Sequence, residues 1–188
     1  MDGGARLTED NAARRFELVV GPHLDAAYNL ARWLTRTPHD ADDVVQESFL
    51  RAFRYFGGFR GGDARAWLLA IVRNTFYTWL EQHRRGEAQV EYDETVAGLQ
   101  GMEAAAEQSL HGTDPEQLLL RSADQGLVEQ ALLKLPAEYR EILVLRELEE
   151  LSYKQIAEIA GIPLGTVMSR LSRARAQLRL QIEAMDQR

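Results

Sequence analysis

The amino-acid sequence predicts an all-α protein with two small helical domains joined by an acidic linker, the C-terminal domain containing a helix-turn-helix. Apolar residues recur at helical spacing on both sides of the middle of the chain, and no segment alternates as a strand would. The middle is acidic and interrupted by glycines, with 9 acidic residues and 1 basic residue between positions 87 and 125. We therefore expect domains at residues 1–86 and 115–188 and a flexible linker at 87–114.

The composition limits the class of protein. The chain has 188 residues, of which 45% are hydrophobic, enough to build two small cores. It contains no cysteine, which excludes disulfides, thiolate metal sites and cysteine nucleophiles. No stretch approaches the roughly eighteen apolar residues of a membrane span, and the first residues lack the apolar segment of a signal peptide. We therefore expect a cytoplasmic protein. The net charge of −7 arises in the middle segment, so the two ends stay close to neutral.

The first domain is expected to hold four helices. Residues 8–20 and 22–34 form the first two, which Gly21 and Pro22 separate. The third begins after Thr37 as N-cap, with Pro38 at the first helical position. The apolar residues of this helix keep a helical period and should face the core: Ala41, Val44, Val45, Phe49, Ala52, Phe53 and Phe56.

The first turns of the third helix are strongly acidic, with carboxylates at Asp40, Asp42, Asp43 and Glu47. Hard metal ions require oxygens that converge from several directions, whereas these carboxylates all come from one helix start. The pattern therefore favours a solvated N-terminus stabilised by the helix dipole. An acidic patch suited to a basic protein partner is compatible with that interpretation, and no metal is expected.

A glycine-rich loop at residues 57–62 follows, with Phe59 and Arg60 at its centre and Asp63 as cap of a fourth helix at 64–83. A flexible loop beside aromatic residues, arginines and Asn74 suits unstacked single-stranded bases. The alternative is that the glycines only connect two helices and Phe59 packs on Trp67 as core. The apolar side of the fourth helix carries Trp67, Leu68, Ile71, Val72, Thr75 and Trp79.

The second domain is expected to begin with two helices. Asp114 and Pro115 start the first, whose inward residues are Leu118, Leu119, Ala123, Leu127, Ala131 and Leu135. Pro136 opens the second, which should end near Leu148 with Tyr139, Ile142, Leu143 and Leu145 facing the core.

The last part of the chain predicts a helix-turn-helix. Ser152 and Gln155 form a capping box, and Leu151 and Ile156 occupy the positions of a hydrophobic staple. Gly161 ends this helix in the left-handed conformation that glycine tolerates. A second helix follows, in which Val167, Leu171, Ala174 and Leu178 form one apolar stripe.

The face opposite that stripe is small, hydroxylated and basic. Hydroxyls and arginines can read base edges in the major groove, while flanking arginines contact phosphates. The competing interpretation is an amphipathic helix whose arginines are merely solvated. The candidate DNA-contacting residues are Thr166, Ser169, Arg170, Ser172, Arg173 and Arg175.

Two other functional classes compete at this point. A stand-alone helix-turn-helix regulator would use the same C-terminal half, but it would require neither the aromatic-glycine loop nor the acidic helix. An enzyme is disfavoured, because the four histidines lack metal-ligand spacing and the 57–62 loop lacks the Lys-Ser/Thr ending of a phosphate-binding loop. We expect neither catalytic residues nor a cofactor.

Two long segments resemble a known family. DADDVVQESFLRAFRYFGGFRGG and AWLLAIVRNTF (residues 40–62 and 66–76), followed by LPAEYREILVLRELEELSYKQIAEIAGIPLGTVMSRLSRARAQLR (residues 135–179), are similar to the bacterial extracytoplasmic-function (ECF) sigma factors. Those proteins consist of sigma regions 2 and 4. The resemblance implies a transcription initiation factor that binds core RNA polymerase and promoter DNA and is held by an anti-sigma factor.

The resemblance also implies roles for particular residues. It places the docking surface for polymerase on the helix at 40–53, with Asp40, Asp42, Asp43, Val44, Gln46 and Glu47. It assigns capture of an unpaired −10 base to Phe56, Phe59, Arg60, Asp63 and Asn74. Ser169, Ser172 and Arg173 occupy positions that read the −35 duplex, whereas Met168 departs from a position that is often basic in relatives. The acidic linker would thread polymerase channels lined for nucleic acid, and we expect it to shield basic faces in the free protein.

Overall fold

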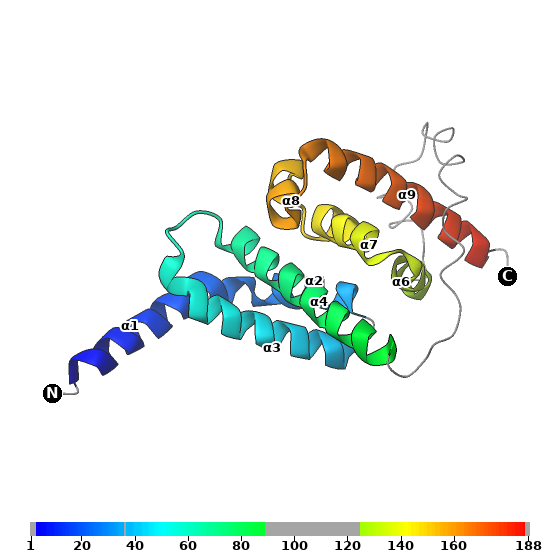
Figure 1. Ribbon diagram of the computed structural model, residues 1–188. Helices are drawn as coiled ribbons and strands as arrows, with labels where there is room; N and C mark the ends of the chain where they lie inside the picture. The colour runs from blue at the N-terminus through cyan, green and yellow to red at the C-terminus, as the bar shows by residue number, and fades with distance from the viewer. Residues whose placement is uncertain (1–2, 36, 89–124, 187–188) are drawn as a thin grey trace. The chain divides into compact units, whose positions relative to one another are not determined.

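The computed structural model describes residues 3–35, 37–88 and 125–186, and every regular element in these ranges is helical (Figure 1). The chain divides into two compact units, one formed mainly by residues up to Glu81 and the other mainly by later residues. None of the described helices is both long and apolar enough to cross a bilayer. The predicted linker at 87–114 and the predicted helix start at Asp114 and Pro115 fall largely or wholly outside the described residues, as do Leu118, Leu119 and Ala123.

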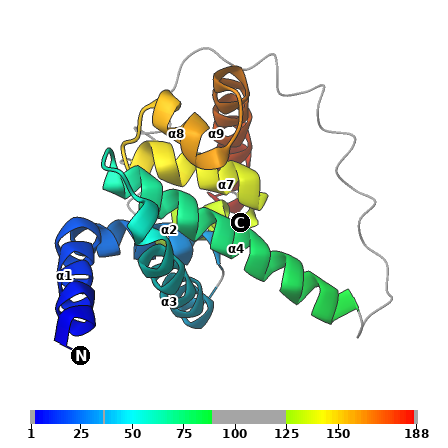
Figure 2. The ribbon, with the colours of Figure 1, turned by 60° about the vertical axis from the view of Figure 1, so that its left-hand side comes forward.

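The N-terminal unit begins with three helices. The first, α1 (Gly3–Val20), starts earlier than predicted and extends beyond its neighbours in both views (Figures 1 and 2). A 3₁₀ turn, η1 (Gly21–His23), separates it from α2 (Leu24–Leu34), because Pro22 pre-sets the turn. The third helix, α3 (Pro38–Tyr55), packs against α2. Its cap is as predicted: the Thr37 hydroxyl accepts from the Asp40 amide at 3.1 Å.

The remainder of this unit is the loop and the fourth helix. A 3₁₀ turn, η2 (Phe56–Gly58), ends α3, and α4 (Ala64–Ala88) runs five residues beyond its predicted end at 83. The fully buried apolar side chains include Leu30, Leu34, Leu68, Leu69, Val72 and Phe76. Leu69 and Phe76 were not among the predicted core residues of α4.

The core face of α3 differs from the prediction at four residues. Phe53 is 51% exposed and Val45 and Phe49 are only half-buried, while Ser48 is fully buried. Ser48 can replace an apolar residue because its hydroxyl donates to the Val44 carbonyl at 2.6 Å, leaving no unpaired polar group. Phe53 instead lies edge-on to Phe16 of α1, with ring centroids 5.2 Å apart.

The C-terminal unit contains α6 (Gln125–Lys134), α7 (Ala137–Leu143), α8 (Tyr153–Ala160) and α9 (Leu164–Asp186). Helix α9 packs against both α6 and α7. Its predicted stripe is the core: Val167, Leu171, Ala174 and Leu178 are at most 3% exposed. On α6 the buried residues are Val128, Leu132 and the predicted Ala131, whereas Leu127 is half-buried. Tyr139, predicted to face the core, is also half-buried.

The helix predicted from Pro136 to Leu148 is regular only to Leu143. It continues as a π-helical turn, η3 (Val144–Leu148), where the Glu149 amide donates to the Val144 carbonyl five residues back at 3.0 Å. Glu150 then takes a positive φ of 52°. Three charged residues that periodicity did not place in the interior, Arg140, Glu141 and Glu149, are at most 3% exposed.

Arg140 explains how α6 and α7 are joined. Its Nη1 donates to the Leu133 carbonyl at 2.9 Å and to the Leu135 carbonyl at 3.2 Å. Carbonyls at a helix C-terminus have no partner within the helix, so a buried guanidinium there satisfies them and complements the helix dipole. The turn between the two helices is therefore stabilised by one side chain.

Candidate nucleic-acid and docking sites

Helix α8 begins with the predicted capping box. The Ser152 amide donates to Gln155 Oε1 at 2.9 Å, and the Gln155 amide donates to the Ser152 hydroxyl at 3.3 Å. The two staple residues, Leu151 and Ile156, are at most 3% exposed. The box and the staple together fix the direction in which the chain enters α8.

The turn between α8 and α9 is short and tightly bonded. Gly161 has a φ of 66°, and the next amide, of Ile162, donates to the Ala157 carbonyl at 3.1 Å. The amides of Thr166 and Val167 then both bond to the Pro163 carbonyl, which starts α9. Two short-linked helices with a glycine in the turn make a helix-turn-helix, with α9 as the recognition helix.

The buried stripe of α9 leaves the other face of its N-terminal half open. Met168 is 53% exposed, and Ser169 and Arg173 are exposed as well. Thr166, Arg170, Ser172 and Arg175 are half-buried at the margins of this face. The Ser169 hydroxyl donates to the Thr166 carbonyl at 3.1 Å, which orients it locally. Met168 was noted in the sequence only as a departure; its exposure places an apolar side chain beside the predicted readers.

The three arginines of α9 between positions 170 and 175 differ in their partners. Arg175 forms a short ion pair with Glu147 of η3, and Arg170 lies 3.5 Å from Glu138 of α7. Arg173 makes no ion pair within the described part of the chain. Sequence reasoning missed both carboxylates, because their partners lie about thirty positions further on and only the packing of α7 against α9 brings them together.

The loop at residues 56–63 is anchored by aromatic contacts. The Phe56 side chain is 5% exposed and lies against Phe16, Phe59 and Trp67. Phe59 is half-buried, with its ring centroid 5.0 Å from that of Trp67. The contact expected if Phe59 served as core is therefore present. Phe56 belongs to the interior, so its ring is not offered on the surface.

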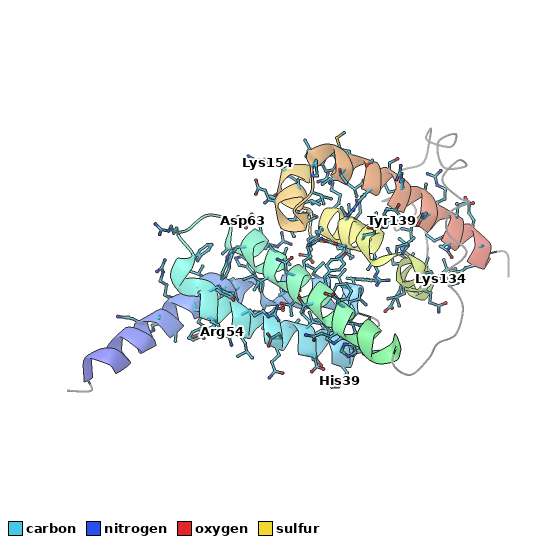
Figure 3. All side chains as sticks on the ribbon, in the orientation of Figure 1. His39, Arg54, Asp63, Lys134, Tyr139 and Lys154 are labelled. Atoms are coloured by element: carbon cyan, nitrogen blue, oxygen red, sulfur yellow. The ribbon has the colours of Figure 1, made fainter. Side chains whose placement is uncertain are left out.

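The tip of the same loop is open. Arg60 is exposed, and Gly61 and Gly62 adopt φ values of 96° and 101°, a conformation that other residues rarely take. Asp63 caps α4 as predicted, with its Oδ1 accepting from the Ala66 amide at 3.0 Å. Figure 3 labels Asp63 at this end of α4.

Asn74 lies on α4 and is exposed. Its Oδ1 accepts from Arg73 Nη1 at 3.2 Å, and the Arg73 guanidinium lies 4.7 Å from the centre of the Tyr77 ring. At about 1.5 Å of rise per residue, Asn74 is roughly 16 Å along the helix from Asp63. The structure therefore does not bring Asp63 and Asn74 to a single point.

The acidic start of α3 separates into exposed and engaged residues. Asp42, Asp43 and Gln46 are exposed, with an Asp43 oxygen 3.8 Å from His39 Nε2. Glu47 is also exposed and pairs with Arg51 one turn later at 2.7 Å. Asp40 is half-buried and accepts the Thr37 hydroxyl at 2.6 Å. Figure 3 labels His39 and Arg54, which lie near the two ends of this helix.

Val44 corrects one sequence-based assignment on this helix. Its side chain is 1% exposed and belongs to the core between α2 and α3. The helix is amphipathic, so the face that carries Val44 packs on the core while the face that carries the acidic residues meets solvent. The surface that α3 can present is therefore acidic and amide-bearing, without Val44.

The comparisons with known proteins agree with this geometry. Residues 19–86 match the family described as Sigma-70 region 2, and residues 125–178 match Sigma-70, region 4. The chain is 32% identical over 168 residues to the ECF RNA polymerase sigma factor SigW of Bacillus subtilis, covering 89% of this chain and 88% of SigW. It is 35% identical over 178 residues to ECF sigma factor SigE of Mycolicibacterium smegmatis, covering 92% of this chain but 63% of SigE.

Solved structures show the same fold. The sigma factor RpoE of Bartonella quintana, crystallised with the anti-sigma factor NepR, superposes with a TM-score of 0.65 at 28% identity, covering 91% of this chain and 96% of RpoE. CnrH in complex with the cytosolic domain of CnrY gives a TM-score of 0.59 at 25% identity, covering 97% and 99%. A stand-alone regulator would not require the region 2 match. The chain therefore belongs to the ECF sigma factors, which are not enzymes and which direct RNA polymerase to promoters.

Proposed function

We propose that the unit containing α9 reads the −35 duplex, while the N-terminal unit docks on core RNA polymerase and captures unpaired −10 bases. The observation that carries the first half is the division of α9 into two faces. The stripe from Val167 to Leu178 fixes the helix on α6 and α7, which leaves Met168, Ser169 and Arg173 exposed in its N-terminal half. Residues in that half of a recognition helix reach base edges in the major groove.

Capture of −10 bases is proposed for two separate positions on the N-terminal unit rather than for one pocket. Arg60 and Asp63 stand at the loop, and Asn74 stands roughly 16 Å further along α4, a separation that exceeds the size of one base. Asn74 offers both a donor and an acceptor to a base edge, and Phe59 offers a partly exposed ring for stacking. The buried Phe56 ring stacks on the Phe59 ring, with centroids 5.9 Å apart.

Docking is proposed for the exposed acidic residues of α3. Asp42, Asp43 and Gln46 are open to solvent, so a basic surface can approach them without disturbing the core. Asp40 and Glu47 are already engaged by Thr37 and Arg51, and they contribute mainly negative potential to this face.

We also propose that an anti-sigma protein holds this chain when it is inactive. RpoE and CnrH were crystallised with the anti-sigma factor NepR and with CnrY, respectively, and both cover nearly the whole of this chain. The site of action is the cytoplasm, where core polymerase and promoter DNA are found. The acidic composition of residues 87–114 suits passage along basic walls of polymerase.

The test of −35 reading is Arg173→Ala in holoenzyme reconstituted with core RNA polymerase. Loss of a base contact should lower affinity by about 1–3 kcal/mol and relax preference at one or two −35 positions. Binding to a set of duplexes with single changes in the −35 element measures this. Lys134→Ala, which removes an exposed cation at the end of α6, serves as control and should leave the preference intact. Unchanged preference at every −35 position in Arg173→Ala would contradict the proposal.

A further inference from the structure

Two carboxylates of the C-terminal unit form ion pairs with two arginines of the recognition helix, and the two pairs differ in geometry. Glu147 of η3 binds Arg175, whereas Glu138 of α7 lies near Arg170. Both arginines flank the face that bears Ser169 and Arg173. Arg170 and Arg175 are both candidates for phosphate contacts, so the difference between their ion pairs predicts a difference in how the two carboxylates affect DNA binding.

The Glu147–Arg175 pair is firm and leaves part of the guanidinium available. Arg175 Nε and Nη2 donate to the same Glu147 Oε1 at 3.2 and 2.6 Å. The Glu147 side chain is 16% exposed and that of Arg175 is 31% exposed, so water screens the pair only in part. A guanidinium has five N–H donors in a rigid fork, and the donors on Nη1 make no hydrogen bond within the described residues. Glu147 therefore fixes the direction of Arg175 without using all of its donors.

The Glu138–Arg170 pair is loose. It consists of one approach of 3.5 Å from Arg170 Nη2 to Glu138 Oε2, and half of the Glu138 side chain is exposed. Exposed pairs of this kind contribute little stability, so Arg170 can exchange Glu138 for another anion. Glu138 itself is favoured at this position because it occupies the first turn of α7, where the helix dipole stabilises a negative charge.

We propose that Glu147 is a positioning residue, which aims Arg175 at a DNA phosphate, and that Glu138 is a restraining residue, which competes with phosphate for Arg170. This inference rests on the proposed role of α9 in reading the −35 duplex. In the bound complex Arg175 keeps Glu147 and adds a phosphate contact. Arg170 gives up Glu138 to reach its phosphate, so this carboxylate lowers the affinity for every duplex sequence.

The two carboxylates therefore predict effects of opposite sign. Removing either one takes away a negative charge near DNA, and charge alone would strengthen binding in both cases. Glu138→Ala should tighten duplex binding about two- to fivefold, the range of one exposed ion pair. Glu147→Ala should weaken it about five- to tenfold, because an ordered charge-assisted contact to phosphate becomes disordered. Glu147→Gln keeps an oxygen acceptor for Arg175 and should restore most of the lost affinity.

The experiment measures binding of reconstituted holoenzyme to a promoter duplex by fluorescence anisotropy over a range of KCl concentrations. A phosphate contact contributes about 0.9 to the slope of log affinity against log salt. Glu147→Ala should flatten this slope by up to about that amount, whereas Glu138→Ala should tighten binding with little change in slope, because Arg170 reaches its phosphate with or without Glu138. Glu183→Ala, an exposed carboxylate near the end of α9, is the matched control for loss of one negative charge.

Double variants separate positioning from folding. In an Arg175→Ala background, Glu147→Ala should no longer weaken binding, whereas a weakening caused by general loss of stability would persist. In an Arg170→Ala background, Glu138→Ala should lose its advantage. Equal tightening by both single alanine variants, or a weakening by Glu147→Ala that survives without Arg175, would overturn the inference. Arg173→Ala tests the underlying −35 role separately. If it leaves the −35 preference intact, the proposed reading role of α9 is wrong. If it relaxes that preference but Glu138→Ala and Glu147→Ala change the affinity in the same direction, only the present inference is wrong.

Discussion

At the scale of single residues, burial separates charged side chains that look alike in the sequence. Arg140 is 3% exposed and serves two backbone carbonyls, whereas Arg173 is exposed and makes no ion pair within the described ranges. A buried guanidinium without acceptors would destabilise the fold, so Arg140 is tied to its turn. Arg173 contributes little to stability and is available to a partner.

Asn74 provides a test at the residue scale. It is exposed, and its side chain accepts from Arg73, so its loss should not disturb the core of the N-terminal unit. We expect Asn74→Ala to leave folding, core binding and −35 recognition unchanged but to impair promoter opening on duplex templates. The physical reason is that flipping a base requires a few kcal/mol, which contacts to its edge must supply. Permanganate footprinting of the −10 region measures the opening.

A template with a mismatched −10 bubble is the control for Asn74→Ala. Its bases are already unpaired, so the variant should recover part of its activity there. Thr78→Ala offers a matched substitution one turn further along α4, where the hydroxyl donates to the Asn74 carbonyl. If Asn74→Ala opens duplex promoters normally, capture of a −10 base must be assigned to other residues.

At the scale of elements, the sequence predicted best those helix ends that a capping side chain or a glycine marks. Thr37, Asp63 and the Ser152–Gln155 box lie where their capping chemistry requires, and Gly161 has the expected left-handed conformation. These signals are local: each depends on a few consecutive residues and on hydrogen bonds within one turn. The apolar stripe of α9 was predictable for the same reason, since its period is a property of one helix.

The features that the sequence did not predict depend on neighbours distant in the chain. Phe53 contacts Phe16 of α1 at the end of α3 instead of entering the core, and no periodicity within α3 encodes that contact. The π turn of η3 is a local exception that apolar periodicity does not reveal: the Leu151 amide donates to the Leu145 carbonyl at 3.0 Å just beyond it. The ion pairs of Glu138 and Glu147 were also not predicted, because their arginine partners lie on α9, about thirty positions away in the sequence.

Gly161 gives a prediction at this scale. Its φ of 66° is unfavourable for any residue with a Cβ, although no atom lies within 4 Å of the position that a Cβ would take. Gly161→Ala should therefore lower the free energy of unfolding by about 1–2 kcal/mol through backbone strain alone. Thermal or urea unfolding followed by circular dichroism measures this change.

Gly165 is the matched control for Gly161. It lies in the first turn of α9, has open space where a Cβ would lie, and has no positive φ. Gly165→Ala should leave the stability unchanged or raise it by roughly 0.5–1 kcal/mol, because alanine favours a helix. Equal destabilisation by both substitutions would mean that the left-handed conformation of Gly161 is not what makes glycine necessary there.

At the scale of the whole molecule, acidic side chains are placed differently in the two units. The acidic residues of α3 face outward, whereas two carboxylates of the C-terminal unit face the arginines of α9. Asp42→Lys combined with Asp43→Lys should abolish association with core polymerase while leaving the helical spectrum and the unfolding midpoint nearly unchanged, because exposed charges contribute little stability. Co-purification with core polymerase measures the association.

Glu17→Lys combined with Asp25→Lys makes an equal change of charge on exposed residues of α1 and α2. This pair should retain more association than the α3 pair, and the difference isolates the position of the charge from its amount. If the α3 pair co-purifies as well as the unchanged protein, α3 does not form the interface.

Because the chain is divided into two compact units, its affinity for a promoter should follow the rules for a bivalent ligand. Once one unit is engaged on DNA, the other meets its element as an intramolecular partner, and its effective concentration replaces its free concentration. Each unit can then bind weakly by itself, and the pair still selects a promoter. The gain disappears when the two elements are spaced so that both cannot be reached at once. Spacing between the elements therefore becomes part of the recognised sequence, although no side chain reads it.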